Sequence, residues 1–170
     1  MKYSTFFLAF LWVISACGQE DKSKRPSPPD SLTSTLANGT TISISYSQPA
    51  VKGRTIGKDL EPMPGKVWRT GANEATVFEV SKAVKVEGSD LPAGKYALFT
   101  IMNGDNWTLI FSKTWNQWGA YDYKEADDAL RVNVKSTKSS QFAERMKFTI
   151  SPQGTVSLLW GDHRVDFTIQ

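Results

Sequence analysis

The sequence predicts an all-β protein, a single antiparallel β-sandwich of jelly-roll-like form with little helix. Beyond residue 31 the chain is rich in Val, Ile, Thr and aromatic residues, which favour strands. Apolar and polar residues alternate strictly in the segments 41–46, 130–135 and 165–169. Such alternation places one face of a strand on a core and the other in water. Turn sequences recur between the apolar runs, as is typical of sandwiches and barrels.

The individual strands follow from these patterns. About ten are expected, near 32–37, 41–47, 76–80, 83–87, 95–102, 106–112, 130–136, 145–150, 155–160 and 164–169. Asn38-Gly39 predicts a two-residue hairpin between the first two. Gly104-Asp105 and Gly161-Asp162 predict two more turns. Only Ser139–Arg145 has helical character.

The N-terminus predicts export and lipidation. Lys2 precedes a short apolar run, Phe6–Ile14, which is well under the roughly 20 residues that span a bilayer. This pattern is typical of a cleaved signal peptide, here residues 1–16. Ile14-Ser15-Ala16-Cys17 has the form of a bacterial lipobox, in which the cysteine receives a diacylglyceryl group and becomes the new N-terminus. Cys17 is the only cysteine, so no internal disulfide can form.

A polar segment follows the lipidation site. Gly18–Ser31 has no aliphatic or aromatic side chain and contains three prolines, so residues 17–31 are expected to form a disordered tether. Residues 32–170 then form the single domain. The expected location is the bacterial cell envelope, with the lipid on Cys17 holding the protein to the outer membrane, on its periplasmic face or at the cell surface.

Composition narrows the possible partners. Without residues 1–16 the chain has 154 residues, and its formal charge falls from +3 to +2 because only Lys2 is lost. The basic residues are scattered, so no nucleic-acid partner is expected. Protein partners and oligomeric state cannot be derived from the sequence.

Six segments together resemble a known family. They are Arg25–Pro29, Ile44–Pro49, Val51–Arg54, Val67–Thr76, Leu91–Ile101 and Trp115–Tyr123. They are similar to the DUF2911 family of uncharacterised proteins, common in Bacteroidota. The resemblance covers nearly all of the mature domain and implies an extracytoplasmic location and a β architecture. It implies no catalytic residues, because the function of the family is unknown.

The sequence has few of the histidine and cysteine residues that bind zinc and no motif that binds a nucleotide cofactor. His163 is the only histidine, and a zinc site usually needs three or four His, Cys or carboxylate ligands. Phosphate loops and dinucleotide fingerprints are missing from the sequence. We therefore expect neither a bound metal nor a cofactor. We expect His163 to lie in an exposed turn.

Two aromatic-polar segments are the candidate site. Trp115–Tyr123 has four aromatic rings interleaved with amides and a carboxylate, and Trp68–Glu74 offers a second wall. A sugar ring presents the apolar faces and polar edges that such a composition fits. The candidate ligand-binding residues are Trp68, Arg69, Asn73, Glu74, Trp115, Asn116, Gln117, Trp118, Tyr121 and Asp122. Arg69 could pair with a ligand carboxylate, and the two segments are expected to meet in space.

Three functions stay open at this point. The first is a binding module for a carbohydrate-like or small polar ligand, which we favour over an enzyme. The second is an envelope-glycan hydrolase that uses Glu74 and Asp122 as a carboxylate pair. The third is a structural or assembly lipoprotein in which the aromatic segments pack inward as a satellite core.

Overall fold

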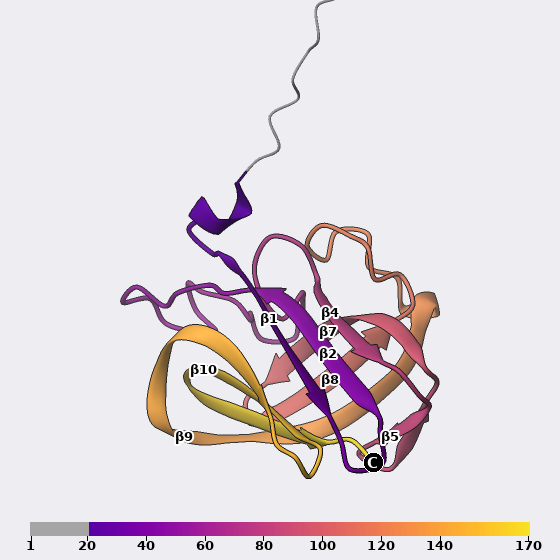
Figure 1. Cartoon of the computed structure of the whole chain (residues 1–170). Coiled ribbons are helices and arrows are strands. Elements are labelled where there is room, and N and C mark those ends of the chain that lie inside the picture. Colours follow the sequence, from indigo (N-terminus) through magenta and orange to yellow (C-terminus); the bar gives the residue numbers. More distant parts are fainter. Residues whose placement is uncertain (1–20) are drawn as a thin grey trace, which may run out of the picture.

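The computed structural model describes residues 21–170, so the expected signal peptide and Cys17 lie outside the described residues. The strands are β1 (Pro29–Thr35), β2 (Thr41–Ser47), β3 (Val67–Trp68), β4 (Thr76–Val80), β5 (Val84–Val86), β6 (Ser89–Leu91), β7 (Gly94–Asn103), β8 (Asn106–Ser112), β9 (Asp128–Ile150) and β10 (Thr155–Thr168). Two 3₁₀ turns, η1 (Lys22–Lys24) and η2 (Glu125–Asp127), are the only helical elements in this part of the chain (Figure 1). The prediction of an all-β, antiparallel single domain is confirmed. No helix within residues 21–170 is long and apolar enough to cross a membrane.

One curled sheet makes up most of the fold. It has eight strands in the order β1-β2-β4-β7-β8-β9-β10, with β3 paired to β7, and β5 and β6 form a separate two-stranded sheet. The curl brings the chain beyond β2 against the second half of β9. There the Val51 N–H donates to the Glu144 carbonyl at 2.8 Å, and the Met146 N–H donates to the Pro49 carbonyl at 3.0 Å. The facing layers are therefore parts of one sheet, and its strands follow each other largely in chain order.

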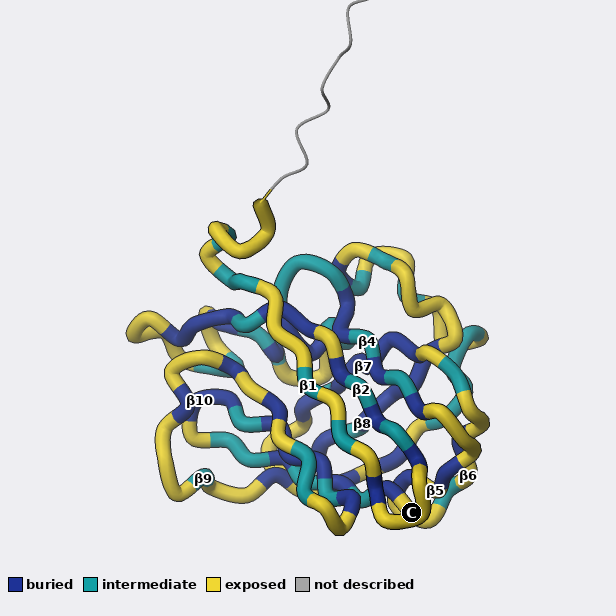
Figure 2. The backbone as a smooth tube through the Cα atoms, viewed as in Figure 1, coloured by how far each residue is buried: buried dark blue, intermediate teal, exposed yellow. Residues whose placement is uncertain are grey.

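The core lies inside this curl, where the inward faces of the strands meet (Figure 2). The alternation that predicted β2 is observed, since Ile42 and Ile44 are fully buried while Ser45 is exposed. Edge-to-face aromatic contacts join the layers. The rings of Phe78 and Phe111 lie 5.1 Å apart, and those of Phe111 and Phe167 lie 6.3 Å apart.

The expected helical segment at Ser139–Arg145 was wrong, since these residues belong to β9. The backbone of 144–146 bonds to the 49–51 segment, which favours extended chain there. The pairing of β9 with β10 shifts register around Ala143 and Lys138, so the surplus residues of β9 form a bulge. The expected turn at Gly161-Asp162 was also wrong, because Gly161 lies inside β10 at the same irregularity, with a φ of 60°.

The domain begins earlier than expected. β1 starts at Pro29, and residues 21–28, which we expected to form part of a disordered tether, contact the domain. The side-chain amide of Asn73 donates to the Ser27 carbonyl at 3.0 Å, and Arg145 donates to the Pro26 carbonyl at 3.4 Å. Hydrogen bonds hold this segment although it has no aliphatic or aromatic side chain to bury.

Candidate functional site

The two aromatic-polar segments meet, as expected. Glu74 and Trp118 form an isolated antiparallel bridge. On either side of it the Ala75 N–H donates to the Gln117 carbonyl, and the Gly119 N–H donates to the Asn73 carbonyl, both at 3.0 Å. Segments more than forty residues apart in the chain are thus joined by backbone hydrogen bonds.

The 68–74 segment forms a tight turn in an uncommon backbone conformation. Thr70 and Asn73 have φ values of 52° and 57°, a region that a β-branched residue such as threonine rarely adopts. Thr70 is fully buried, and its carbonyl accepts a hydrogen bond from the Thr76 hydroxyl at 2.7 Å. Its own hydroxyl donates to Thr100 at 3.2 Å. Strained residues held by such contacts cluster at binding sites.

A cavity of about 300 Å³ opens where the two segments join. Four of the candidate residues line it, namely Trp68, Arg69, Asn73 and Trp118. A second hollow of about 220 Å³ shares Glu61, Trp68 and Arg69 with the first and adds Tyr121. We call these two hollows together the tryptophan cavity. Arg69 lines both of its halves.

The aromatic residues of the site divide into buried and exposed groups. Trp68 is only 2% exposed, and its indole N–H donates to the Gly71 carbonyl at 3.1 Å, so it forms a fixed wall. Trp118 is 50% exposed and Tyr121 is 81% exposed. Trp115 lies outside the tryptophan cavity, with the Lys95 ammonium 5.4 Å from its ring centre. The segments therefore combine core packing with an open aromatic surface.

Gly119 allows two side chains of the site to pack directly against the backbone. Its φ is 67°, and a Cβ atom at this position would lie 2.9 Å from the Tyr121 ring and 3.2 Å from Nη1 of Arg69. Only glycine combines this backbone conformation with so close an approach. The glycine after Trp118 therefore lets the Arg69 guanidinium pass beside the backbone.

The domain matches one family model, described as "Protein of unknown function (DUF2911)", over residues 27–169. The chain belongs to the DUF2911 family. No curated protein and no solved structure matches it. All residues of the tryptophan cavity fall within the DUF2911 match, whereas Lys22 and Arg25 precede it.

Glu74 of the DUF2911 domain is tied to the N-terminal segment. Its carboxylate lies 2.7 Å from the Lys22 ammonium and 3.1 Å from the Arg25 guanidinium. Burial alone raises the pKa of Glu74, but hydrogen bonds from Lys22, its own backbone N–H and Arg25 outweigh this effect and lower the pKa to about 2. Glu74 is therefore an ionised anchor for the segment.

The proposed partner of Glu74 lies elsewhere. Asp122 is exposed and lines neither half of the tryptophan cavity. Asn116 and Gln117 do not line it either, and the Gln117 amide donates to the Thr114 carbonyl. The structure thus brings the two segments together without placing the two carboxylates across a shared cavity.

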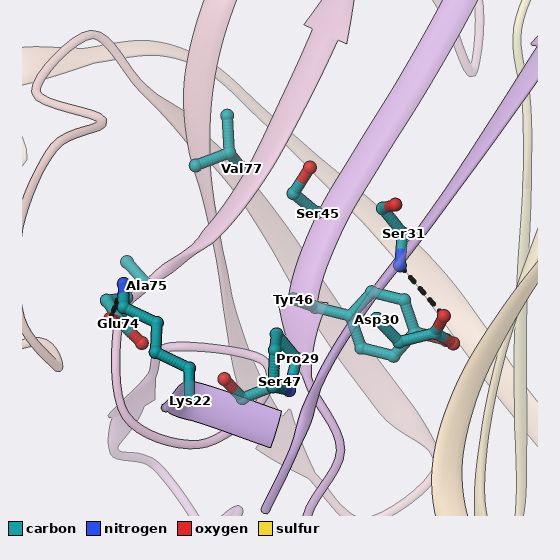
Figure 3. A pocket seen from close by; sticks show the side chains of 10 residues that line it. All are labelled: Lys22, Pro29, Asp30, Ser31, Ser45, Tyr46, Ser47, Glu74, Ala75 and Val77. Carbon is teal, nitrogen blue, oxygen red and sulfur yellow. Dashed lines mark hydrogen bonds and ion pairs between the residues drawn. The ribbon is translucent and has the colours of Figure 1, made fainter. Parts of the chain in front are cut away.

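Sequence reasoning missed a larger hollow of about 480 Å³ on the outer face of β1, β2 and β4, beneath η1. Figure 3 shows Lys22 beside Glu74 at one end and Asp30 near Tyr46 at the other. The charges there are satisfied, since Lys22 pairs with Glu74 and Asp30 accepts from the Tyr46 hydroxyl at 2.7 Å. Its floor is made of small side chains such as Ser45, which sequence patterns do not single out.

Residues 21–170 contain no group of three or more His, Cys, Asp or Glu side chains placed to hold a metal ion. His163 is part of β10, where its ring lies 6.0 Å from that of Trp107. Five of the ten candidate ligand-binding residues line the tryptophan cavity, namely Trp68, Arg69, Asn73, Trp118 and Tyr121.

Proposed function

We propose that the DUF2911 domain of this chain is a binding module for a small polar, carbohydrate-like ligand that occupies the tryptophan cavity. The observation that carries this proposal is the position of Trp118, which is half exposed in the wall of a cavity of about 300 Å³. Ligand pockets of about this size hold small molecules between apolar walls and a few polar groups. The aromatic face suits a sugar ring, and Arg69 and Asn73 supply polar contacts to its edge.

The rigidity of the surrounding turn supports the same proposal. Trp68 is held by the Gly71 carbonyl, and the Trp160 indole N–H donates to the Glu61 carbonyl at 2.8 Å. Both indoles line the cavity and are almost fully buried. A ligand would meet a wall that is ordered before it binds, which lowers the entropic cost of association.

The geometry favours binding over glycan hydrolysis. A glycosidase needs two carboxyl groups on either side of one bond, one of them with a raised pKa so that it can donate a proton. Glu74 has a lowered pKa and is engaged by Lys22 and Arg25, and Asp122 lies outside the cavity.

We further propose that the protein is a lipoprotein of the bacterial cell envelope, held to the membrane by acylated Cys17. The lipobox Ile14–Cys17 after a short apolar run supports this location. One acyl chain gives only marginal membrane binding, whereas two or more give stable anchoring.

A fluorescence titration tests the binding function. The purified full-length chain is titrated with a panel of neutral and acidic monosaccharides and disaccharides, and the tryptophan emission is recorded. At least one sugar should change the emission, and Trp118→Ala should abolish that response. Trp115→Ala is the matched control, because Trp115 is an exposed tryptophan of the same segment that does not line the cavity. A flat response to the whole panel, or equal losses in both variants, would count against the proposal.

A further inference from the structure

The tryptophan cavity contains two arginine side chains whose charges are not neutralised. Arg54 and Arg69 both line it, yet neither forms a salt bridge with a carboxylate among residues 21–170. Arg131 and Arg164, by contrast, pair with Asp128 and Asp166 at 2.6 and 2.8 Å. Three of the six arginines among residues 21–170 form salt bridges, and two of the three that do not, Arg54 and Arg69, line this one cavity.

Backbone carbonyls orient both guanidinium groups. Nε and Nη2 of Arg54 donate to the carbonyls of Val51 and Ala50 at 3.1 and 2.7 Å. Nη1 of Arg69 donates to the Asn73 carbonyl at 2.9 Å. These bonds leave Nη1 of Arg54 and Nε and Nη2 of Arg69 without a hydrogen-bond acceptor in the described part of the chain. Donors held in place in this way are ready for an external acceptor.

Among residues 21–170, Glu61 is the only acidic residue that lines the cavity. One oxygen of its carboxylate accepts a hydrogen bond from the Met63 N–H at 2.7 Å, and it forms no salt bridge with either arginine. Two arginines against one carboxylate leave a surplus positive charge in the cavity wall.

We propose that the ligand of the tryptophan cavity carries a carboxylate, as a uronic acid does, and that Arg69 pairs with it while Arg54 adds a second positive charge. This inference rests on the proposed function and names its ligand class. The planar guanidinium fork of arginine matches a carboxylate in geometry as well as charge. Arg69 is shared by both hollows, so it can reach the carboxylate of a sugar whose ring lies against Trp118.

Isothermal titration calorimetry with a charged ligand and its neutral isostere tests this assignment. The full-length chain is titrated with D-glucuronate and D-galacturonate and, separately, with the corresponding uronamides, which replace the carboxylate by an uncharged amide. A charge-assisted pair should make each acid bind about tenfold more tightly than its amide. This preference should shrink in Arg69→Gln and in Arg54→Gln, and it should persist in Arg164→Gln, the control that removes a paired arginine elsewhere.

Arg69 also supports the 68–74 turn, so the Arg69→Gln variant can fail to fold. In that case Arg54→Gln and a salt titration of the unaltered chain still test the proposal. Raising the salt concentration should weaken binding of the acid and leave the amide unaffected. Equal affinities for acid and amide would overturn the carboxylate assignment and leave the binding function standing. Failure of both acids and both amides to bind would overturn this inference, whereas the binding function falls only if the whole sugar panel also leaves the tryptophan emission unchanged.

Discussion

The two tryptophans at the junction of the segments should respond very differently to removal. Trp118 is half exposed, so its side chain hides roughly 100 Å² of the 150–250 Å² that a buried aromatic covers. At about 25 cal/mol per Å² this burial is worth about 2 kcal/mol, once the residual burial in the unfolded chain is discounted. The Arg25 guanidinium, 5.7 Å from the ring centre, adds about 0.5–1 kcal/mol. Trp118→Ala should therefore lower the free energy of unfolding by about 2–3 kcal/mol.

Trp68→Ala should cost more. Trp68 is 2% exposed, so truncation leaves a cavity in the core, and it also removes the donor to the Gly71 carbonyl. Such truncations cost about 3–5 kcal/mol, with about 1 kcal/mol more for the lost hydrogen bond.

Urea denaturation of the full-length variants, followed by circular dichroism, measures both changes. If Trp118→Ala proves as costly as Trp68→Ala, the wall of the tryptophan cavity is core, and the reasoning that assigns it to a ligand is refuted.

Three further predictions concern the N-terminal anchor, the closure of the sheet and the membrane. The carboxyl of Glu74 has a pKa lowered from 4.5 to about 2, so its stabilising effect is present above pH 4.5 and is lost as the pH falls towards 2. The difference in Tm between the wild type and Glu74→Gln should therefore vanish between pH 4.5 and pH 2. A difference in Tm that stays constant over this range would contradict the ion pairing. Tyr46→Phe should cost about 1–3 kcal/mol in urea denaturation, because it removes the acceptor of the Phe148 N–H at 3.2 Å, and an unchanged midpoint would argue against this link across the sheet. Cys17→Ser should release the protein from the membrane fraction, and retention there would place the anchor elsewhere.

The sequence was most informative where structure depends on neighbours in the chain. The alternation in 41–46 identified β2 and its buried face, and Asn38-Gly39 identified the hairpin to β1. Ser139–Arg145 has no such alternation, and its extended form depends on the segment 49–51 far away in the chain. The local sequence pattern therefore failed to predict the strand where its pairing partner is far away in the chain.

The same division applies to the candidate site. The composition of the two aromatic segments identified four residues that line the 300 Å³ half of the tryptophan cavity, but it could not separate buried Trp68 from half-exposed Trp118. That difference depends on which ring faces the core after the segments have joined. Arg54 was missed as a site residue because it belongs to an irregular stretch between β2 and β3, where the segment Val51–Arg54 contributed to the family resemblance but has no aromatic or carboxylate side chain to suggest a ligand.

The docked N-terminal segment shortens the distance that the tether can place between the domain and the membrane. A freely extended segment would hold the domain a few nanometres from the bilayer, but residues 22–27 are fixed to the domain beside the cavity. Lys22 and Arg25 bind Glu74, and Ser27 lines the cavity itself. On the proposed lipidation, only five residue steps separate Cys17 from Lys22, a reach of at most about 18 Å. Figure 1 shows η1 at the N-terminal end of the described chain, projecting from the domain. Because Ser27 of the docked segment lines the cavity, the proposed lipidation would put the cavity near the point of attachment. A ligand in this cavity would therefore be captured close to the bilayer surface.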